Sequence, residues 1–271
     1  MKRPLRELPI IRSRKTLAVI TVVLVWAISY ILYYRYFGAL PQGTISLFQE
    51  MPHPTKQDVV VVFSPHQDDE TLGAGGYIHE SITVGAQVYV VFATDGDHRR
   101  LKTIRQQESQ KAAHILGVPD DHLIYYNYPD LDLEANTLEL NKSVHNTLLE
   151  LRPTIVLVTD LVDIHPDHAV LGTSVAREVA RAISNPKLYT FLIHYPEYPR
   201  PQQFRSPLAL LPPVRLLEPR RQWLKFTLTQ SNINAKHTAV LQYKSQLRTP
   251  ILRSLILSFI RQNEIFSKET P

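Results

Sequence analysis

The chain has 271 residues, no cysteine and a formal net charge of +5. The missing cysteines exclude disulfides, thiolate metal sites and cysteine nucleophiles, so any metal here must be held by histidine and carboxylate groups. Residues 1–15 contain six Lys or Arg and one Glu, which accounts for the whole net charge. Because the rest of the chain is neutral, we expect no nucleic acid among its partners.

An apolar stretch without any charged residue runs from Thr16 to Tyr34. As a helix it would reach about 28 Å, close to the ~30 Å hydrocarbon core of a bilayer. A cleaved signal peptide has a shorter apolar region followed by small residues, which this stretch lacks. We therefore expect a single transmembrane anchor over residues 16–36, preceded by a basic cytoplasmic tail at 1–15. The positive-inside rule then places the rest of the chain outside the cytoplasm.

Residues 37–57 carry the proline and glycine punctuation of a linker. From residue 58 onward, apolar β-branched runs alternate with helical patterns. The predicted strands are 58–64, 87–93, 122–126, 154–159 and 188–194, and the predicted helices are 70–84, 103–117, 138–151 and 168–183. This alternation predicts one α/β domain over 58–271, with a Rossmann-like, doubly wound, mostly parallel sheet and helices on both faces. In such sheets the first and fourth strands are often neighbours where ligands bind.

Seven prolines fall within residues 196–219, so this stretch fits neither a helix nor a central strand. Its arginines extend a little further, and we expect residues 196–225 to form a Pro- and Arg-rich lid or surface loop. The chain then returns to helical patterns near 230–247 and 251–266.

Two clusters of histidine and carboxylate each follow a predicted strand. The first is Ser64-Pro65-His66-Gln67-Asp68-Asp69-Glu70, and the second is His165-Pro166-Asp167-His168. A hydrolytic zinc site takes three N or O ligands and leaves one position open for water. His66, Asp69 and His168 could supply such a set. Asp68 and Asp69 are adjacent and project in different directions, so one can bind the metal while the other faces the bound water. Asp163 and Asp167 are near enough to orient an imidazole.

Each cluster alone also has an ordinary explanation. A pair of histidines three residues apart is common on solvated helix surfaces, and acidic residues are favourable at any helix N-terminus. The two clusters together, each at a strand end, favour a metal site. Serine catalysis is not supported, because the chain has no Gly-x-Ser-x-Gly elbow. The glycines at 73–76 lie in a helical pattern and indicate close helix–sheet packing rather than a phosphate loop.

These motifs resemble the PIG-L/LmbE-like zinc-dependent N-acetylglucosaminyl deacetylases, over roughly residues 58–195. The resemblance rests on the two clusters, on Ala93-Thr94-Asp95-Gly96-Asp97 and on Arg105-x-x-Glu108. It implies one zinc ion held by His66, Asp69 and His168. It further implies Asp68 as general base, His165 as the group that stabilises the tetrahedral intermediate, and Arg105 near the substrate. The family usually has proline where Gln67 stands, and some members have tyrosine where Asp163 and Ile164 stand.

The resemblance implies removal of the N-acetyl group from an N-acetylglucosamine-type sugar in a glycan, glycolipid or glycoconjugate, including lipid-linked or cell-envelope sugars. Two alternatives stay open. One is an amidase acting on a non-sugar amide or a thiol conjugate. The other is a catalytically silent sugar-binding module, against which the intact Asp68 argues.

Overall fold

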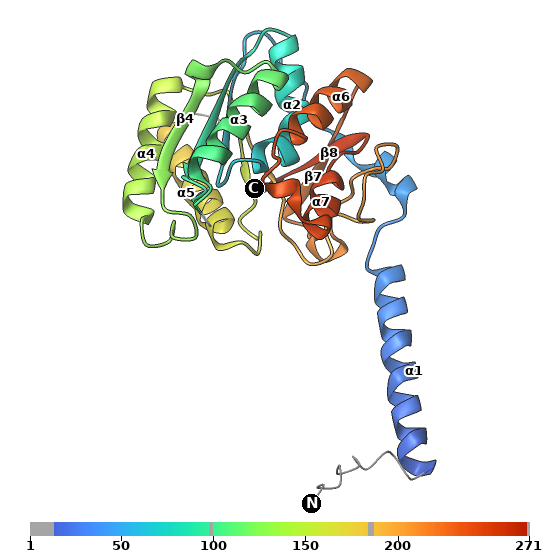
Figure 1. Cartoon of the computed structure of the whole chain (residues 1–271). Helices are drawn as coiled ribbons and strands as arrows, with labels where there is room; N and C mark the ends of the chain where they lie inside the picture. Colours follow the sequence, from blue (N-terminus) through green and yellow to red (C-terminus); the bar gives the residue numbers. More distant parts are fainter. Residues whose placement is uncertain (1–13, 98–99, 184–186, 270–271) are drawn as a thin grey trace, which may run out of the picture. The chain divides into compact units, whose positions relative to one another are not determined.

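The computed structural model describes residues 14–97, 100–183 and 187–269 (Figure 1). The chain divides into two compact units, Met1–Leu40 and Pro41–Pro271, with the division inside the predicted linker. In the first unit, α1 (Arg14–Phe37) contains a segment, Arg14–Tyr33, that is long and apolar enough to cross a membrane by length and composition, with a mean hydropathy of 2.2. Most of the predicted basic tail, residues 1–13, lies outside the described residues.

The second unit is a mixed α/β fold around an eight-stranded sheet in the order β1-β7-β8-β6-β5-β2-β3-β4. The pairings are parallel except those of β8, which runs antiparallel to both β6 and β7. The strands are β1 (Gln49–Glu50), β2 (Val59–Ser64), β3 (Gln87–Thr94), β4 (Leu123–Tyr128), β5 (Ile155–Thr159), β6 (Lys187–Phe191), β7 (Arg221–Thr227) and β8 (Asn263–Glu269).

Helices cover both faces of this sheet. Along β2, Val60 and Val62 belong to a core shared with α2, α3 and α6, whereas Val61 and Phe63 belong to a core shared with α4 and α5. A strand buried on both faces needs an unbroken apolar run, which is what β2 provides. The helices are α2 (Asp69–Thr83), α3 (Lys102–Leu116), α4 (Thr137–Leu151), α5 (Pro166–Ala182), α6 (Gln230–Val240) and α7 (Pro250–Leu257), with 3-10 turns η1 (Gln42–Leu47), η2 (Asp120–His122), η3 (Val214–Leu216) and η4 (Gln246–Arg248).

The alternating strands and helices predicted between residues 58 and 194 are confirmed. The first and fourth predicted strands are neighbours, since β2 pairs in parallel with β5, Val60 opposite Ile155 and Phe63 opposite Val158. The glycines of α2 do serve close packing: a Cβ on Gly73 would stand 2.1 Å from the ring of Phe191.

The predictions for the C-terminal third are partly wrong. The helix predicted near 251–266 ends at Leu257 in the structure, and residues 263–269 form β8 instead. Tertiary context decides this segment, because β8 fills the space between β6 and β7 and pairs with both. The segment 196–225 is not simply a surface loop, since it buries Ala209, Leu210 and Leu216 and its last residues enter β7. The predicted linker likewise contains β1.

A buried ion pair joins α2 to the C-terminal elements. The ammonium group of Lys236 on α6 lies 2.6 Å from a carboxylate oxygen of Glu264 on β8 and donates to the carbonyl of Leu72 at 2.8 Å. The same carboxylate accepts the backbone N–H groups of Gly76 (2.7 Å) and Tyr77 (2.9 Å). Both charged side chains are fully buried, so each depends on the other for compensation.

Removing one partner of this pair should destabilise the fold strongly. We expect Lys236→Met to lower the free energy of unfolding by about 3–5 kcal/mol, because Glu264 is left as a buried, unpaired charge. A matched control is Arg181→Met, which removes an arginine that is 65% exposed and leaves its partner Glu178 in contact with His145, and it should cost less than about 1 kcal/mol. Urea unfolding of the two variants checks this, and equal losses would contradict it.

Candidate metal and catalytic centre

The loop between β2 and α2 is held in place by a buried glutamate. Glu70, only 2% exposed, accepts the backbone N–H of Asp68 at 3.1 Å and the hydroxyl of Tyr243. Its own N–H donates to the hydroxyl of Ser64 (3.1 Å), which in turn donates to the carbonyl of His66 (2.7 Å). These bonds hold the loop backbone at His66 and Asp68 in place before any ligand binds.

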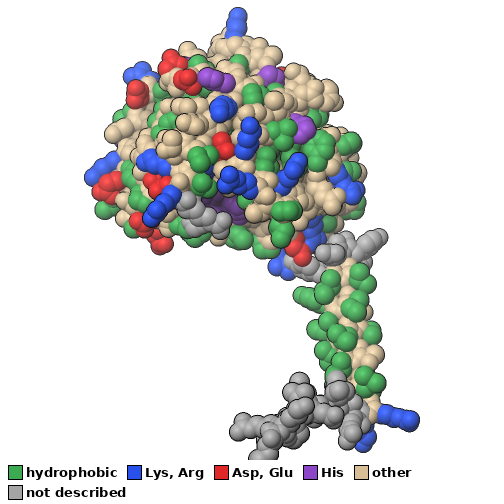
Figure 2. All heavy atoms as spheres, in the orientation of Figure 1, with side chains coloured by type: hydrophobic (Ala, Val, Ile, Leu, Met, Phe, Trp, Pro, Cys, Tyr) green, Lys and Arg blue, Asp and Glu red, His purple; other side chains and the backbone are tan. Residues whose placement is uncertain are grey.

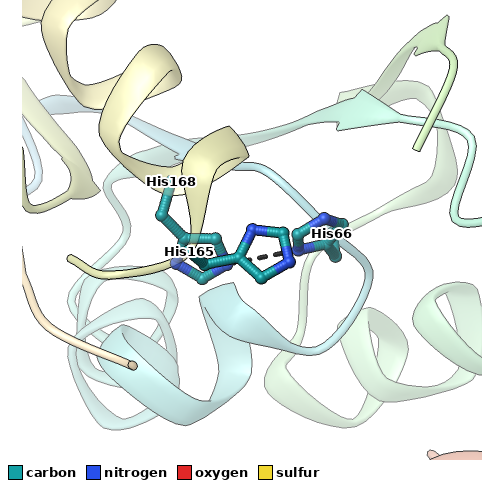
Figure 3. A group of neighbouring side chains, drawn as sticks. All are labelled: His66, His165 and His168. Carbon is teal, nitrogen blue, oxygen red and sulfur yellow. Dashed lines mark hydrogen bonds between the residues drawn. The ribbon is translucent and has the colours of Figure 1, made fainter. Parts of the chain in front are cut away.

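Three potential metal ligands, His66, Asp69 and His168, converge from two segments about a hundred residues apart; Figure 3 shows the two histidines with His165 beside them. Nδ1 of His66 lies 3.1 Å from Oδ2 of Asp69 and 3.2 Å from Nε2 of His168, and the last two atoms are 3.1 Å apart. A tetrahedral zinc ion with bonds of about 2.0–2.1 Å separates its ligand atoms by about 3.3 Å. The donor triangle therefore has the size and the N/N/O composition that zinc requires.

Each ligand imidazole turns its other nitrogen toward a carboxylate. Nδ1 of His168 lies 3.1 Å from Asp163, which also accepts the backbone N–H groups of Ile193 and His194. Nε2 of His66 lies 3.2 Å from both Asp130 and Asp167. Such partners orient a ligand histidine and increase its basicity. Asp163 and Asp167 thus each lie close enough to a histidine to orient its imidazole, as predicted.

Negative charge dominates this cluster. Burial by itself lowers the pKa of His168, but the charges and hydrogen bonds of Asp69 and Asp163 outweigh it and raise that pKa to about 9. Likewise, the pKa of His66 is raised well above its ordinary value against the effect of burial, because Asp130, Asp167 and Asp69 bond to the ring. The surrounding carboxylates thus favour a positive charge between them.

Asp68 lies beside the donor triangle in a constrained geometry. Its backbone has φ 137°, a value rarely adopted by residues other than glycine. Nη2 of Arg105 lies 3.2 Å from its carboxylate and 2.9 Å from the carbonyl of Gln67. Burial raises the pKa of Asp68 to about 7, although the positive charge of Arg105 opposes the rise. In the structure, then, Arg105 contacts the carboxylate that was predicted to be the general base.

His165 stands at the start of α5 and faces the same cluster. Its ring centroid is 4.7 Å from that of His66 and 4.9 Å from that of His168. Its Nδ1 is buried and has no hydrogen-bond partner among the described residues. Burial, reinforced by the neighbouring imidazoles, lowers the pKa of His165 to about 4, so the ring is neutral at pH 7.

Sequence reasoning missed two residues of the site. Asp130 follows β4 and bonds to His66, and His194 follows β6 with its ring 4.8 Å from that of His168. His194, Asp69 and His168 offer ligand atoms within 4.8 Å of one another. The one available signal was placement, because Asp130 comes shortly after the strand predicted at 122–126 and His194 is the last residue of the strand predicted at 188–194.

Residues 61–179 match the family model described as PIG-L, GlcNAc-PI de-N-acetylase. The chain carries a PIG-L family domain. A probable N-acetyl-alpha-D-glucosaminyl L-malate deacetylase 2 of Bacillus anthracis is 29% identical over 143 residues, which are 48% of this chain and 62% of that protein. The match thus spans under two thirds of the relative's own length.

Solved structures share the fold of the PIG-L domain. The N,N'-diacetylchitobiose deacetylase of Pyrococcus horikoshii has a TM-score of 0.58 and 20% identity, over 82% of this chain and 87% of that one. GalB, the 4-carboxy-2-hydroxymuconate hydratase of Pseudomonas putida, has a TM-score of 0.56 and 18% identity, over 75% and 83%. Since one fold carries two different reactions, the function must be argued from the site.

Metal analysis of purified variants tests the assignment of ligands. We expect about one zinc per chain, lost in Asp69→Ala and His168→Ala because each removes one of three ligands. Asp68→Asn should keep its zinc, since that carboxylate pairs with Arg105 instead of the donor triangle. An empty site in Asp68→Asn together with a filled site in Asp69→Ala would show that the two aspartates have exchanged roles.

Proposed function

We propose that the chain is a zinc-dependent deacetylase, a hydrolase that removes the N-acetyl group from an N-acetylglucosamine-type sugar, built on a Rossmann-like doubly wound sheet. The observation that carries this proposal is the triangle formed by His66, Asp69 and His168, with Asp68 beside it and no thiol in the chain. The relatives named as deacetylases of N-acetylated sugars support the same reaction.

His66, Asp69 and His168 would hold the metal. A zinc ion bound there lowers the pKa of its water toward ~7 and polarises the acetamide carbonyl. The protein contributes the fixed orientation of these ligands, through the carboxylates that face their outer nitrogens. It also keeps the three ligand side chains almost entirely out of solvent.

Asp68 acts as the general base. It accepts the proton of the attacking water, and a pKa near 7 suits a group that must take up a proton and then release it at neutral pH. The guanidinium of Arg105, 3.2 Å away, keeps the carboxylate aimed as its charge changes. The proton then passes to the leaving nitrogen as the C–N bond breaks, which yields acetate and a free amino sugar.

His165 stabilises the oxygen that becomes negative when water adds to the carbonyl carbon. It is neutral, and a neutral imidazole carries one N–H that can donate to that oxygen without competing for the water's proton. The two tasks therefore fall on two side chains from different segments, Asp68 just before α2 and His165 just before α5.

Substitution of the base tests the mechanism. Asp68→Asn keeps the size of the side chain but cannot accept the proton, so we expect kcat to fall by about 10²–10⁴-fold. A matched control is Asp121→Asn, an exposed carboxylate in η2, which should leave kcat unchanged. An Asp68→Asn enzyme with full activity would contradict the role of general base.

Measuring the reaction products distinguishes the alternative functions. Acetate release from an acetamido sugar, but not from an N-acetylated thiol conjugate, supports the sugar deacetylase. The reverse selectivity supports the other amidase, and binding without acetate release supports the silent sugar-binding module.

We also propose that α1 anchors the protein in a membrane, with the tail in the cytoplasm and residues 41–271 outside. The apolar, uncharged segment and the basic residues before it support this orientation. Protease added to intact right-side-out spheroplasts should degrade the C-terminal domain. Protection that ends only on lysis would place the domain in the cytoplasm.

A further inference from the structure

Two large apolar side chains are exposed beside the metal site. Leu131 is 55% exposed and Ile164 is 62% exposed. Leu131 directly follows Asp130, whose carboxylate lies 3.2 Å from Nε2 of His66. Ile164 directly precedes His165, whose ring centroid is 4.7 Å from that of His66. Both side chains therefore stand within one residue of a group that faces a metal ligand.

The backbone around these two residues is bonded to the site itself. The N–H of Leu131 donates to Asp167 at 2.8 Å, and the same carboxylate oxygen lies 3.2 Å from Nε2 of His66. The N–H of Ile164 donates to the carbonyl of His194 at 3.0 Å. The two loops that follow β4 and β5 are thus joined, and their exposed apolar side chains belong to one rim. Figure 2 shows histidine side chains recessed in a hollow of the domain surface, with hydrophobic as well as Lys and Arg side chains around it.

Leu131 also has an unfavourable backbone conformation. Its φ is +66°, in the left-handed region where glycine is free of strain and leucine is not. An exposed side chain gains little from burial, so folding does not account for a leucine at this position. Strained residues of this kind cluster at ligand-binding sites.

We propose that Leu131 and Ile164 form an apolar subsite for an alkyl or aryl group attached to the N-acetylated sugar. This inference rests on the proposed function and narrows its substrate class to N-acetylglucosaminides with an apolar aglycone. Continuity with the site argues for this occupant: each of the two side chains is one residue from a group that faces His66, so a group bonded directly to a sugar held at the metal would lie near them. Burying the methylene groups of the aglycone against Leu131 and Ile164 removes apolar surface of both the aglycone and the protein from water.

The experiment uses the full chain in nanodiscs and compares methyl with butyl N-acetylglucosaminide. A fully buried methylene is worth up to about fourfold in affinity, so three partly buried ones should raise kcat/KM for the butyl glycoside at least about fivefold. In Leu131→Gly/Ile164→Ser this ratio should fall to about one, with the methyl glycoside unaffected. Leu131→Gly alone should not lower the melting temperature, because it relieves the backbone strain. A purely structural role for Leu131 predicts the opposite.

The matched control is Leu149→Ser, which removes a leucine that is 50% exposed at the far end of α4 and should keep the butyl preference. Equal turnover of the two glycosides by the wild type, or a preference that survives in the double variant, overturns the subsite. So does a change of oligomeric state in the double variant with the preference intact, which would make the rim an interface between copies. If neither glycoside is hydrolysed, the proposed function fails. The subsite is then tested by calorimetric binding of both glycosides to Asp68→Asn, where the butyl glycoside should bind at least about fivefold more tightly than the methyl glycoside.

Discussion

β2 and β5 pair in parallel, and their register brings together two chemical clusters that are a hundred residues apart in the chain. Both strands are buried on both faces, so a slip of one residue would turn every side chain toward the opposite core. The loops that follow the two strands begin at the same edge of the sheet. The distance of 3.2 Å between His66 and His168 is thus a consequence of apolar packing well below the site.

A second constraint on the site comes from the C-terminal elements, which bond to α2 and to the loop before it. Tyr243 donates to Glu70, and Glu70 fixes the loop that carries Asp68. Lys236 and Glu264 hold the first turns of α2 through their backbone groups. Buried polar groups of this kind are favourable only when each finds its partner. The loop that carries Asp68 therefore depends on residues more than 160 positions further along the chain.

The parts of the molecule that could be predicted from sequence are those with a local signal. The run of valines in β2 predicts a buried strand from a few adjacent residues, and the neighbouring carboxylates at 68 and 69 likewise indicate a metal site. Asp130 and His194 carry no such signal, because each is a single polar residue whose role depends on which strands are neighbours. β8 was missed for a related reason, since its partners β6 and β7 are distant in sequence and its apolar residues continue the helical pattern of α7.

The place of β8 in the sheet has a consequence for biosynthesis. β8 lies between β6 and β7 and is bonded to both, so the eight strands become one sheet only after residues 263–269 have been made. Until then the edges of β6 and β7 are unpaired, and such edges can associate with other chains. The second unit must therefore complete its fold after synthesis of this strand, when the N-terminal helix has long since emerged. A nascent chain of this protein therefore carries an unpaired β6 edge from the synthesis of residues 187–191 until that of residues 263–269, and this edge needs protection.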